Sequence, residues 1–119
     1  MRNFKELKVW QKGFEIAINC FKITNEFPSQ ENFGLVSQIN RCGVSIPSNI
    51  SEGSSRTSDK DYSRFIEISL GSCFELETQL LIAQELNLGN SATIKENLAL
   101  IMEEEKMLTA FSKSLKANG

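Results

Sequence analysis

Residues 38–53 read Q-I-N-R-C-G-V-S-I-P-S-N-I-S-E-G, and this stretch decides the fold. Apolar residues recur through it every three or four positions, which is the spacing of one face of an α-helix. That face consists of Leu35, Ile39, Cys42, Ile46 and Ile50. The stretch therefore predicts a helix with one side turned towards a core.

Pro47 stands in the middle of this predicted helix. A proline inside a helix removes one amide donor and presses its ring against the carbonyl four residues earlier, at a cost of about 3 kcal/mol. The residue at that earlier position is Gly43, which has no side chain and lets the backbone bend away. Because the apolar spacing stays in phase across Pro47, we expect a continuous, kinked helix. The alternative is a helix that ends here, with Ile46 extended before the proline.

A polar stripe runs beside the apolar face, turned from it by about 100°. It consists of Gln38, Arg41, Ser45, Asn49 and Glu52. One interpretation is a solvated helix flank. The other is a half-buried stripe with polar partners on another helix, since a buried Arg or Glu needs a partner. Glu75 is a candidate partner for Arg41 or Gln38.

The chain has 119 residues, a length typical of one domain with a core large enough to fold without disulfides or metals. No segment alternates with a period of two for long enough to indicate a sheet. No apolar run reaches the length of a membrane span, and no signal region follows Met1. We therefore expect an all-α, cytoplasmic protein that does not enter a membrane.

Four helical segments are predicted, at about residues 7–24, 30–54, 58–88 and 92–116. The second would start near Ser29 or Gln30, just after Pro28. Ser58 and Asp61 resemble a capping box at the start of the third, and Gly89 suits the C′ position at its end. Short connections favour antiparallel neighbours, so residues 1–119 are predicted to form a single up-down-up-down four-helix bundle.

The first predicted helix carries two apolar stripes. The stronger one, which its spacing assigns to the bundle core, consists of Leu7, Trp10, Phe14, Ala17, Ile18 and Phe21. The second consists of Val9, Gly13, Ile16, Cys20 and Ile23. A peripheral helix of a monomeric bundle needs one stripe. The extra stripe indicates either a wide core face or, as we favour, burial against another subunit.

The third predicted helix repeats this pattern. Its core candidates are Tyr62, Phe65, Ser69, Cys73, Leu76, Leu80 and Ala83. A candidate oligomer face beside them consists of Leu70, Phe74, Leu81 and Leu88. Gly71 and Ser72 form a small pair in the middle of the helix, which lowers helix stability unless another backbone packs closely there.

Histidine is absent from the chain, which removes the commonest general base and the commonest transition-metal ligand. A Glu-x-x-His di-iron bundle is excluded, and there is no phosphate loop or nucleophile elbow. Cys20, Cys42 and Cys73 each fall on an apolar helical face and are predicted to be reduced core thiols. We therefore expect no catalytic, metal-binding or cofactor-binding site.

Two acidic features were weighed as alternatives. Glu105 intrudes on the apolar face of the fourth helix and is interpreted as a charge at the bundle edge rather than as a catalytic acid. An enzyme built on a buried acid–base cluster of Arg41, Glu52 and Glu75 is the least favoured hypothesis.

Three strings of sequence resemble the four-helix bundle family named for proteins encoded in 23S ribosomal RNA intervening sequences. They are residues 7–12 (L-K-V-W-Q-K), residues 33–53 (F-G-L-V-S followed by the stretch quoted first), and residues 71–80 (G-S-C-F-E-L-E-T-Q-L). The resemblance implies a bacterial origin, an antiparallel bundle, a ring-shaped homopentamer and no established enzymatic activity. It also implies a relationship to the accessory variability proteins of diversity-generating retroelements. Those are pentameric barrels that use a basic surface to associate with nucleic acid and a reverse transcriptase.

The resemblance assigns no catalytic role to the motif positions, so we expect structural or interface roles for them. The matching residues are Gln38, Arg41, Ser45, Pro47, Asn49, Glu52, Gly53, Gly71, Ser72, Glu75, Thr78 and Gln79. The chain departs from the family pattern at Gly43 and Ser51, where alanine is common, and at Asn40. Asn40 replaces a second basic residue, which weakens a nucleic-acid interpretation.

Two functions remain from the sequence. One is a homo-oligomeric binding module for RNA or for a reverse-transcriptase-like enzyme, with candidate nucleic-acid contacts at Arg56, Lys60 and Arg64. Against it stands the net charge of −2, because phosphate binding normally leaves a basic footprint. The other is a protein-interaction scaffold without affinity for nucleic acid, which the acidic balance and the doubled apolar stripes favour.

Overall fold

The structure is a computed structural model that describes residues 3–32 and 34–118, so Phe33 of the family motif lies outside the described residues. These residues form two short 3-10 helices, η1 and η2, and four α-helices, and they contain no strand. The bounds are η1 (Phe4–Glu6), α1 (Lys8–Thr24), η2 (Ser29–Glu31), α2 (Leu35–Ser54), α3 (Asp59–Glu85) and α4 (Ser91–Asn118).

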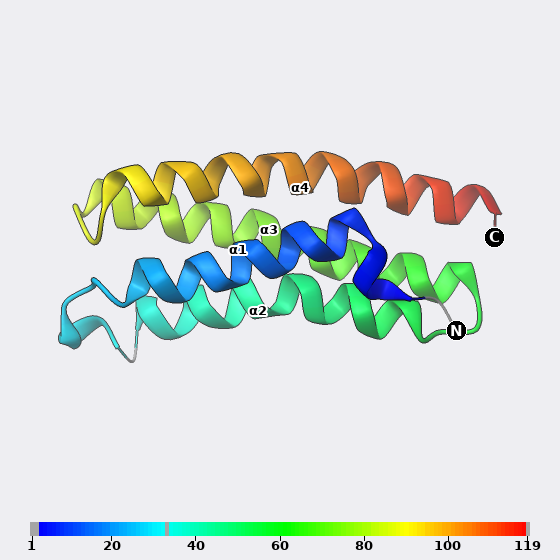
Figure 1. Ribbon diagram of the computed structural model, residues 1–119, viewed down its shortest axis with the longest axis horizontal. Coiled ribbons are helices and arrows are strands. Elements are labelled where there is room, and N and C mark those ends of the chain that lie inside the picture. Colours follow the sequence, from blue (N-terminus) through cyan, green and yellow to red (C-terminus); the bar gives the residue numbers. More distant parts are fainter. Residues whose placement is uncertain (1–2, 33, 119) are drawn as a thin grey trace.

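The four α-helices form an elongated bundle in which successive helices run in opposite directions (Figure 1). α1 and α3 each pack against α2 and α4, so α1 and α3 lie diagonally across the bundle. The principal extents are 46 × 22 × 20 Å. The all-α four-helix bundle predicted from the sequence is confirmed. In the described ranges, no helix combines the length and the apolar character needed to cross a bilayer.

The second α-helix begins later than the sequence predicted. Residues 29–31 form the separate helix η2, and α2 starts at Leu35. Gly34 stands between the two with φ −105° and ψ −106°, a conformation that is neither helical nor extended. The backbone therefore breaks at this glycine. The helix start expected at Ser29 or Gln30 is wrong for α2, because both residues lie inside η2, where neither forms a side-chain cap.

The N-terminal end of α3 is capped as predicted. The Ser58 side chain accepts a hydrogen bond from the Asp61 amide at 3.1 Å. Such a cap satisfies one of the amide donors that the first turn of a helix leaves without a partner.

The C-terminal end of α3 comes earlier than residue 88, and Asn87 rather than Gly89 takes the C′ position, with φ 56°. The amide of Leu88 donates to the Ala83 carbonyl at 2.9 Å, and the amide of Asn87 donates to the Gln84 carbonyl at 3.0 Å. This pair of bonds is a Schellman motif. Asparagine tolerates the left-handed conformation, and its presence explains the early stop.

The centre of the bundle is filled mostly by branched aliphatic side chains from all four helices. Those with almost no exposed surface are Ile16, Ile23, Ile39, Ile46, Ile50, Ile66, Leu76, Leu80, Ile94, Ile101 and Leu108, together with Tyr62. The core positions predicted for the third helix are confirmed, with Phe65 half-buried and the others buried.

The buried face of α1 is not the one that the sequence predicted. Phe14 and Phe21 of the stronger stripe are 49% and 50% exposed, and Ala17 is the one member of that stripe that is buried. The second stripe, from Val9 to Ile23, is buried instead. Its small residues let α1 approach α2 closely, and close packing requires such a fit of sizes. The assignment of the aromatic stripe to the core was therefore wrong.

Pro47 lies inside a continuous α2, so the alternative in which the helix ends before it is wrong. A kink at this position stays a prediction. Gly43 has a further role besides accommodating the proline. A Cβ at Gly43 would lie 2.9 Å from Cys20 Sγ and 3.5 Å from Ala17 Cα. Glycine therefore sets the distance between α1 and α2.

Candidate interaction surfaces and buried acids

The middle of the polar stripe on α2 forms a hydrogen-bonded contact with α3. Ser45 Oγ lies 2.8 Å from Ser72 Oγ. Asn49 Nδ2 donates to the Ser45 carbonyl at 2.8 Å and to Ser45 Oγ at 2.9 Å. The Cys42 thiol lies 3.7 Å from the Ser72 carbonyl. Ser45, Asn49 and Ser72 are half-buried, so this part of the stripe joins two helices rather than facing solvent.

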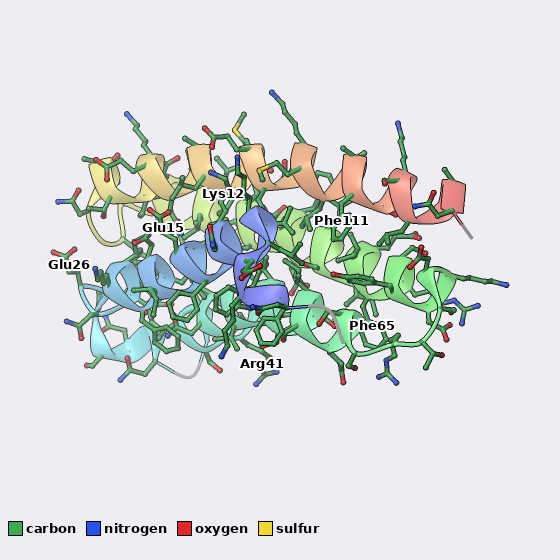
Figure 2. All side chains as sticks on the ribbon, turned by 45° about the vertical axis from the view of Figure 1, so that its right-hand side comes forward. Lys12, Glu15, Glu26, Arg41, Phe65 and Phe111 are labelled. Carbon is green, nitrogen blue, oxygen red and sulfur yellow. The ribbon has the colours of Figure 1, made fainter. Side chains whose placement is uncertain are left out.

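The end residues of the stripe, Gln38, Arg41 and Glu52, are exposed, and Gln38 lies near Gln79 of α3. Gln79 Nε2 donates to Glu75 Oε2 at 3.3 Å and lies 3.5 Å from Gln38 Oε1. Arg41 reaches away from α2 (Figure 2) and is exposed. Among the described residues it forms no ion pair with Glu75, so the partner suggested for Arg41 from the sequence is not found within this subunit.

Arg41, Glu52 and Glu75 do not form a buried acid–base cluster. All three side chains are exposed, and Glu52 lies 3.8 Å from Arg56 on its own helix. A catalytic acid–base group depends on burial or a close partner to shift its pKa. The hypothesis of a buried catalytic cluster at these residues is therefore wrong.

The two motif glycines have opposite surroundings. A Cβ at Gly53 would lie 2.7 Å from Phe65 Cβ and 2.9 Å from Tyr62 Cδ1, so this glycine lets the end of α2 pack on α3. No atom lies within 4 Å of a Cβ placed at Gly71. The cost of Gly71 to the helix, about 1 kcal/mol, is thus not offset by close packing within the subunit.

An apolar groove of about 320 Å³ lies between α1 and α2. Aromatic rings form a row along the groove. The centroid of the Trp10 ring lies 5.3 Å from that of Phe4 and 5.2 Å from that of Phe14. The described lining carries no charged side chain and consists of Phe4, Trp10, Phe14, Ala17, Ile18, Phe21, Val44, Pro47, Ser48 and Ser51. The aromatic stripe of α1 thus forms one wall of a groove on the surface.

A second apolar surface covers the outer side of α3. We call it the α3 face, and it consists of Ile68, Phe74, Leu81, Ile82 and Leu86, which are 45% to 60% exposed. Of the predicted oligomer face, Phe74 and Leu81 are exposed, whereas Leu70 and Leu88 are half-buried against the core. Thr78 lies on the same side, and its hydroxyl donates to the Phe74 carbonyl at 2.9 Å. The hydroxyl is thus engaged by its own helix, and the exposed carboxylates Glu67, Glu75 and Glu85 stand among the apolar side chains.

The candidate nucleic-acid contacts gather at the turn between α2 and α3. The guanidinium of Arg56 lies 4.6 Å from the centroid of the Phe65 ring, and Phe65 is labelled in Figure 2. The same guanidinium lies 3.8 Å from the Glu52 carboxylate. Arg64 lies 3.8 Å from Asp61, and Lys60 is exposed. The structure brings the three cations to one end of the bundle, where nearby carboxylates counter two of the charges.

A buried carboxylic acid on α4 was missed from the sequence. Glu104 is fully buried, and neither of its carboxyl oxygens has a hydrogen-bond partner among the described residues. Burial raises the pKa of Glu104 to about 8, with a smaller opposite effect from Lys12. The spacing held a signal, because Glu104 follows Ile101 by three positions and precedes Leu108 by four. Those intervals place it on the buried face of the helix.

Glu105 is half-buried, in keeping with the predicted place at the bundle edge. Desolvation, followed by the neighbouring Glu77 carboxyl on α3, raises the pKa of Glu105 to about 8. Both effects favour the protonated form of Glu105, so its charge at the bundle edge stays a prediction.

Cys20, Cys42 and Cys73 are free and buried, which confirms the prediction of core thiols. Burial raises the pKa of Cys20 and Cys42 to about 12, and it raises that of Cys73 as well. Thiols that stay protonated are poor nucleophiles and poor metal ligands. Within residues 3–32 and 34–118, no group of three or more acidic or thiol side chains is arranged to hold a metal ion.

Known proteins place this architecture in a family. The model of the family described as 23S rRNA-intervening sequence protein matches residues 5–110. The fold is similar to the crystal structure of a protein of unknown function from the S23 ribosomal protein family of Bacteroides thetaiotaomicron VPI-5482. The two share 25% identity at a TM-score of 0.78, over 88% of this chain and 98% of the other. No curated protein matches the chain.

Proposed function

We propose that this chain, which belongs to the 23S rRNA-intervening sequence protein family, is a non-enzymatic binding module that assembles with copies of itself. The observation that carries the proposal is the exposure of two large apolar surfaces, the groove between α1 and α2 and the α3 face. Monomeric proteins rarely expose extended apolar patches, and such patches mark interaction sites. Each surface would be buried when copies join.

The two surfaces favour a head-to-tail arrangement. One is a groove on α1 and α2, and the other covers α3, which lies diagonally across the bundle from α1. A contact between two different patches of one chain is heterologous, and a heterologous contact that closes gives a ring. In this proposal the α3 face of one copy fills the groove of the next. A homopentamer is the ring that the family resemblance implies.

Gly71 supports the use of α3 as a contact surface. It lies in the middle of a long helix, where glycine lowers stability, and nothing in the subunit fills the space beside it. A helix from a second copy can approach the backbone closely at such a position. The assembly then explains a glycine that the isolated bundle does not need.

The ligand that we propose is RNA or a protein that acts on nucleic acid, such as a reverse-transcriptase-like enzyme. A ring repeats the basic end formed by Arg56, Lys60 and Arg64 once per copy. Five copies carry a net charge of 5 × (−2) = −10, so phosphate contacts would be confined to this end.

The assembly is tested by light scattering on the purified protein at micromolar concentration. The expected result is a mass several times the 13.4 kDa of one chain. A stable monomer at that concentration would refute the proposed use of both apolar surfaces.

Nucleic-acid binding is tested by titrating structured and single-stranded RNA at about 50 mM and about 200 mM salt. The variant Arg56→Gln, Lys60→Gln, Arg64→Gln is expected to lose at least about tenfold in affinity at the lower salt concentration. The control Lys8→Gln, Lys22→Gln, Lys95→Gln removes the same charge elsewhere and is expected to bind nearly as the parent does. If the parent shows no salt-sensitive binding, the RNA hypothesis is abandoned.

The second candidate function is a protein-interaction scaffold without affinity for nucleic acid. The carboxylates beside Arg56 and Arg64 favour it, as does the negative net charge. A pull-down from the native host separates the two functions. Recovery of a protein partner by an assembly that binds no RNA would support the scaffold.

A further inference from the structure

Glu104 lies where α4 meets α1 and α2. A Cβ at Gly13 would lie 3.0 Å from Glu104 Oε2, 3.1 Å from Ile46 Cγ2 and 3.5 Å from the Pro47 nitrogen. The carboxyl oxygen thus lies in space that the absence of a side chain at Gly13 leaves open. Pro47 has no amide hydrogen, so the backbone at this point offers no donor. A carboxylate held here would be charged and without a donor, which is strongly unfavourable.

Titratable groups on each helix lie near this position or near its neighbours. Lys12 on α1 and Cys73 on α3 interact electrostatically with Glu104, and Cys42 on α2, Glu77 on α3 and Glu105 on α4 act on Cys73. Glu103 on α4 accepts from Lys12. Among these described groups, Lys12 alone carries a positive charge. Its ammonium donates to Glu103 Oε2 at 2.8 Å, and Figure 2 shows Lys12 between α1 and α4. Lys12 is therefore the cation that we expect an ionised Glu104 to pair with.

The surface above Lys12 is a groove of about 640 Å³, which we call the α1–α4 seam. Its lining consists of Lys8, Gln11, Lys12, Glu15, Glu103, Lys106 and Met107. α1 packs less extensively on α4 than on α2. The seam thus follows the weaker of the two helix contacts of α1 and is open to solvent. Lys12, which lines the seam, is also the cation that acts on Glu104.

We propose that Glu104 is a proton-controlled latch between α4 and the α1–α2 pair. With its proton, the side chain stays in the dry core and α4 stays packed on α1. When the proton is lost to bulk water, the carboxylate leaves the core for Lys12 and solvent, and the seam loosens. The device is independent of the proposed assembly and of any nucleic-acid ligand.

The direction of the pH effect follows from the pKa. Burial raises the pKa of Glu104 from 4.5 to about 8, so between these values the folded protein holds a proton that the unfolded chain has released. Stability therefore falls as the pH rises through this range and levels off above it. Relative to Glu104→Gln, which stays neutral, the unfolding constant of the parent is expected to rise up to about tenfold per pH unit in this range.

The first test is an NMR titration of the glutamate side-chain carbons in the intact protein. Glu104 is expected to titrate near pH 8, and its resonance is identified by its loss in Glu104→Gln. A midpoint at the ordinary value for glutamate would overturn the proposal. This measurement uses the parent protein, so it stands even if a variant folds poorly.

Two neighbouring variants separate a latch from a merely buried acid. Lys12→Met removes the cation and is expected to raise the Glu104 midpoint further. Glu103→Gln releases Lys12 from its surface partner and is expected to lower the midpoint. If both variants keep the Glu104 midpoint of the parent, Lys12 takes no part, and the proposed movement is overturned.

Hydrogen exchange at matched pH tests the opening itself. At about pH 4 the parent and Glu104→Gln are expected to exchange alike, because the carboxyl then keeps its proton in both the closed and the opened protein. At about pH 9, amides of α1 and α4 along the seam are expected to exchange at least about tenfold faster in the parent. Equal exchange at both pH values, or an equal acceleration in all four helices, would contradict a latch confined to the seam.

Discussion

The groove between α1 and α2 and the α3 face both expose large apolar side chains, but they differ in how they use glycine. Behind the groove, Cys20 and Ala17 of α1 occupy the space that a side chain at Gly43 would need. The absence of that side chain therefore serves packing within the subunit. On α3, Gly71 borders open space. The glycine behind the groove is therefore explained by packing within one subunit, whereas packing within the subunit does not explain the glycine on α3.

The largest expected effect comes from a charge on the α3 face. Phe74→Glu is expected to weaken self-association by at least about a hundredfold, because a carboxylate would be buried in an apolar groove. Light scattering measures the mass and far-ultraviolet circular dichroism measures the helix content, which should not change. Ala99→Glu, on the exposed side of α4, is the matched control. If Phe74→Glu unfolds the chain, Phe74 belongs to the core.

Mixing two variants tests the head-to-tail geometry. Phe14→Glu blocks the groove, and Phe74→Glu blocks the α3 face, so each variant alone should stay monomeric. A mixture retains one intact groove and one intact α3 face and is expected to give heterodimers but no ring. A mixture that stays monomeric would contradict the pairing of these two surfaces.

A smaller effect is expected beneath the groove. Gly43→Ala places a methyl group 2.9 Å from Cys20 Sγ and 3.2 Å from Cys20 Cβ, so the helices must move apart. The free energy of unfolding is expected to fall by about 1–3 kcal/mol, the usual cost of overpacking. Urea denaturation at a protein concentration that favours the monomer measures it. No loss of stability would mean that the contact between α1 and α2 is looser than the structure shows.

The smallest effect, and the sharpest contrast, is expected at Gly71. Gly71→Ala meets no atom within the subunit and replaces a poor helix former, so the monomer should gain about 0.5–1 kcal/mol. The same change should weaken assembly if a second copy packs against this backbone. Denaturation of the monomer and light scattering are therefore expected to respond in opposite directions. Unchanged or stronger assembly would remove Gly71 from the proposed interface.

Much of the fold could be predicted because the relevant signals are local. Helical periodicity indicated all four helices, and the Ser58 cap was recognisable from two residues. The buried face of α1 could not be chosen in the same way. Hydrophobicity favoured the stripe with Trp10, Phe14 and Phe21, whereas packing selected the stripe with Gly13 and Cys20, whose small size lets a neighbouring helix approach. That choice depends on a partner helix and is not visible within one segment.

The polar positions show the same division. Ser45 and Ser72 were recognised as motif residues, but their contact joins two helices and required the structure. Glu104 was overlooked among three successive glutamates, although its spacing placed it on the buried face. An acidic residue is normally assigned to solvent, whereas the burial of Glu104 raises its pKa and favours the protonated form.

The three buried cysteines make this protein convenient to label. Each native thiol lies in the core and resists deprotonation, so a cysteine introduced at an exposed position should react with a maleimide dye well before any of them. Fluorophores can thus be attached to the groove or to α3 without first replacing the native residues. Energy transfer between labelled copies would then report which surfaces face each other in the assembled particle.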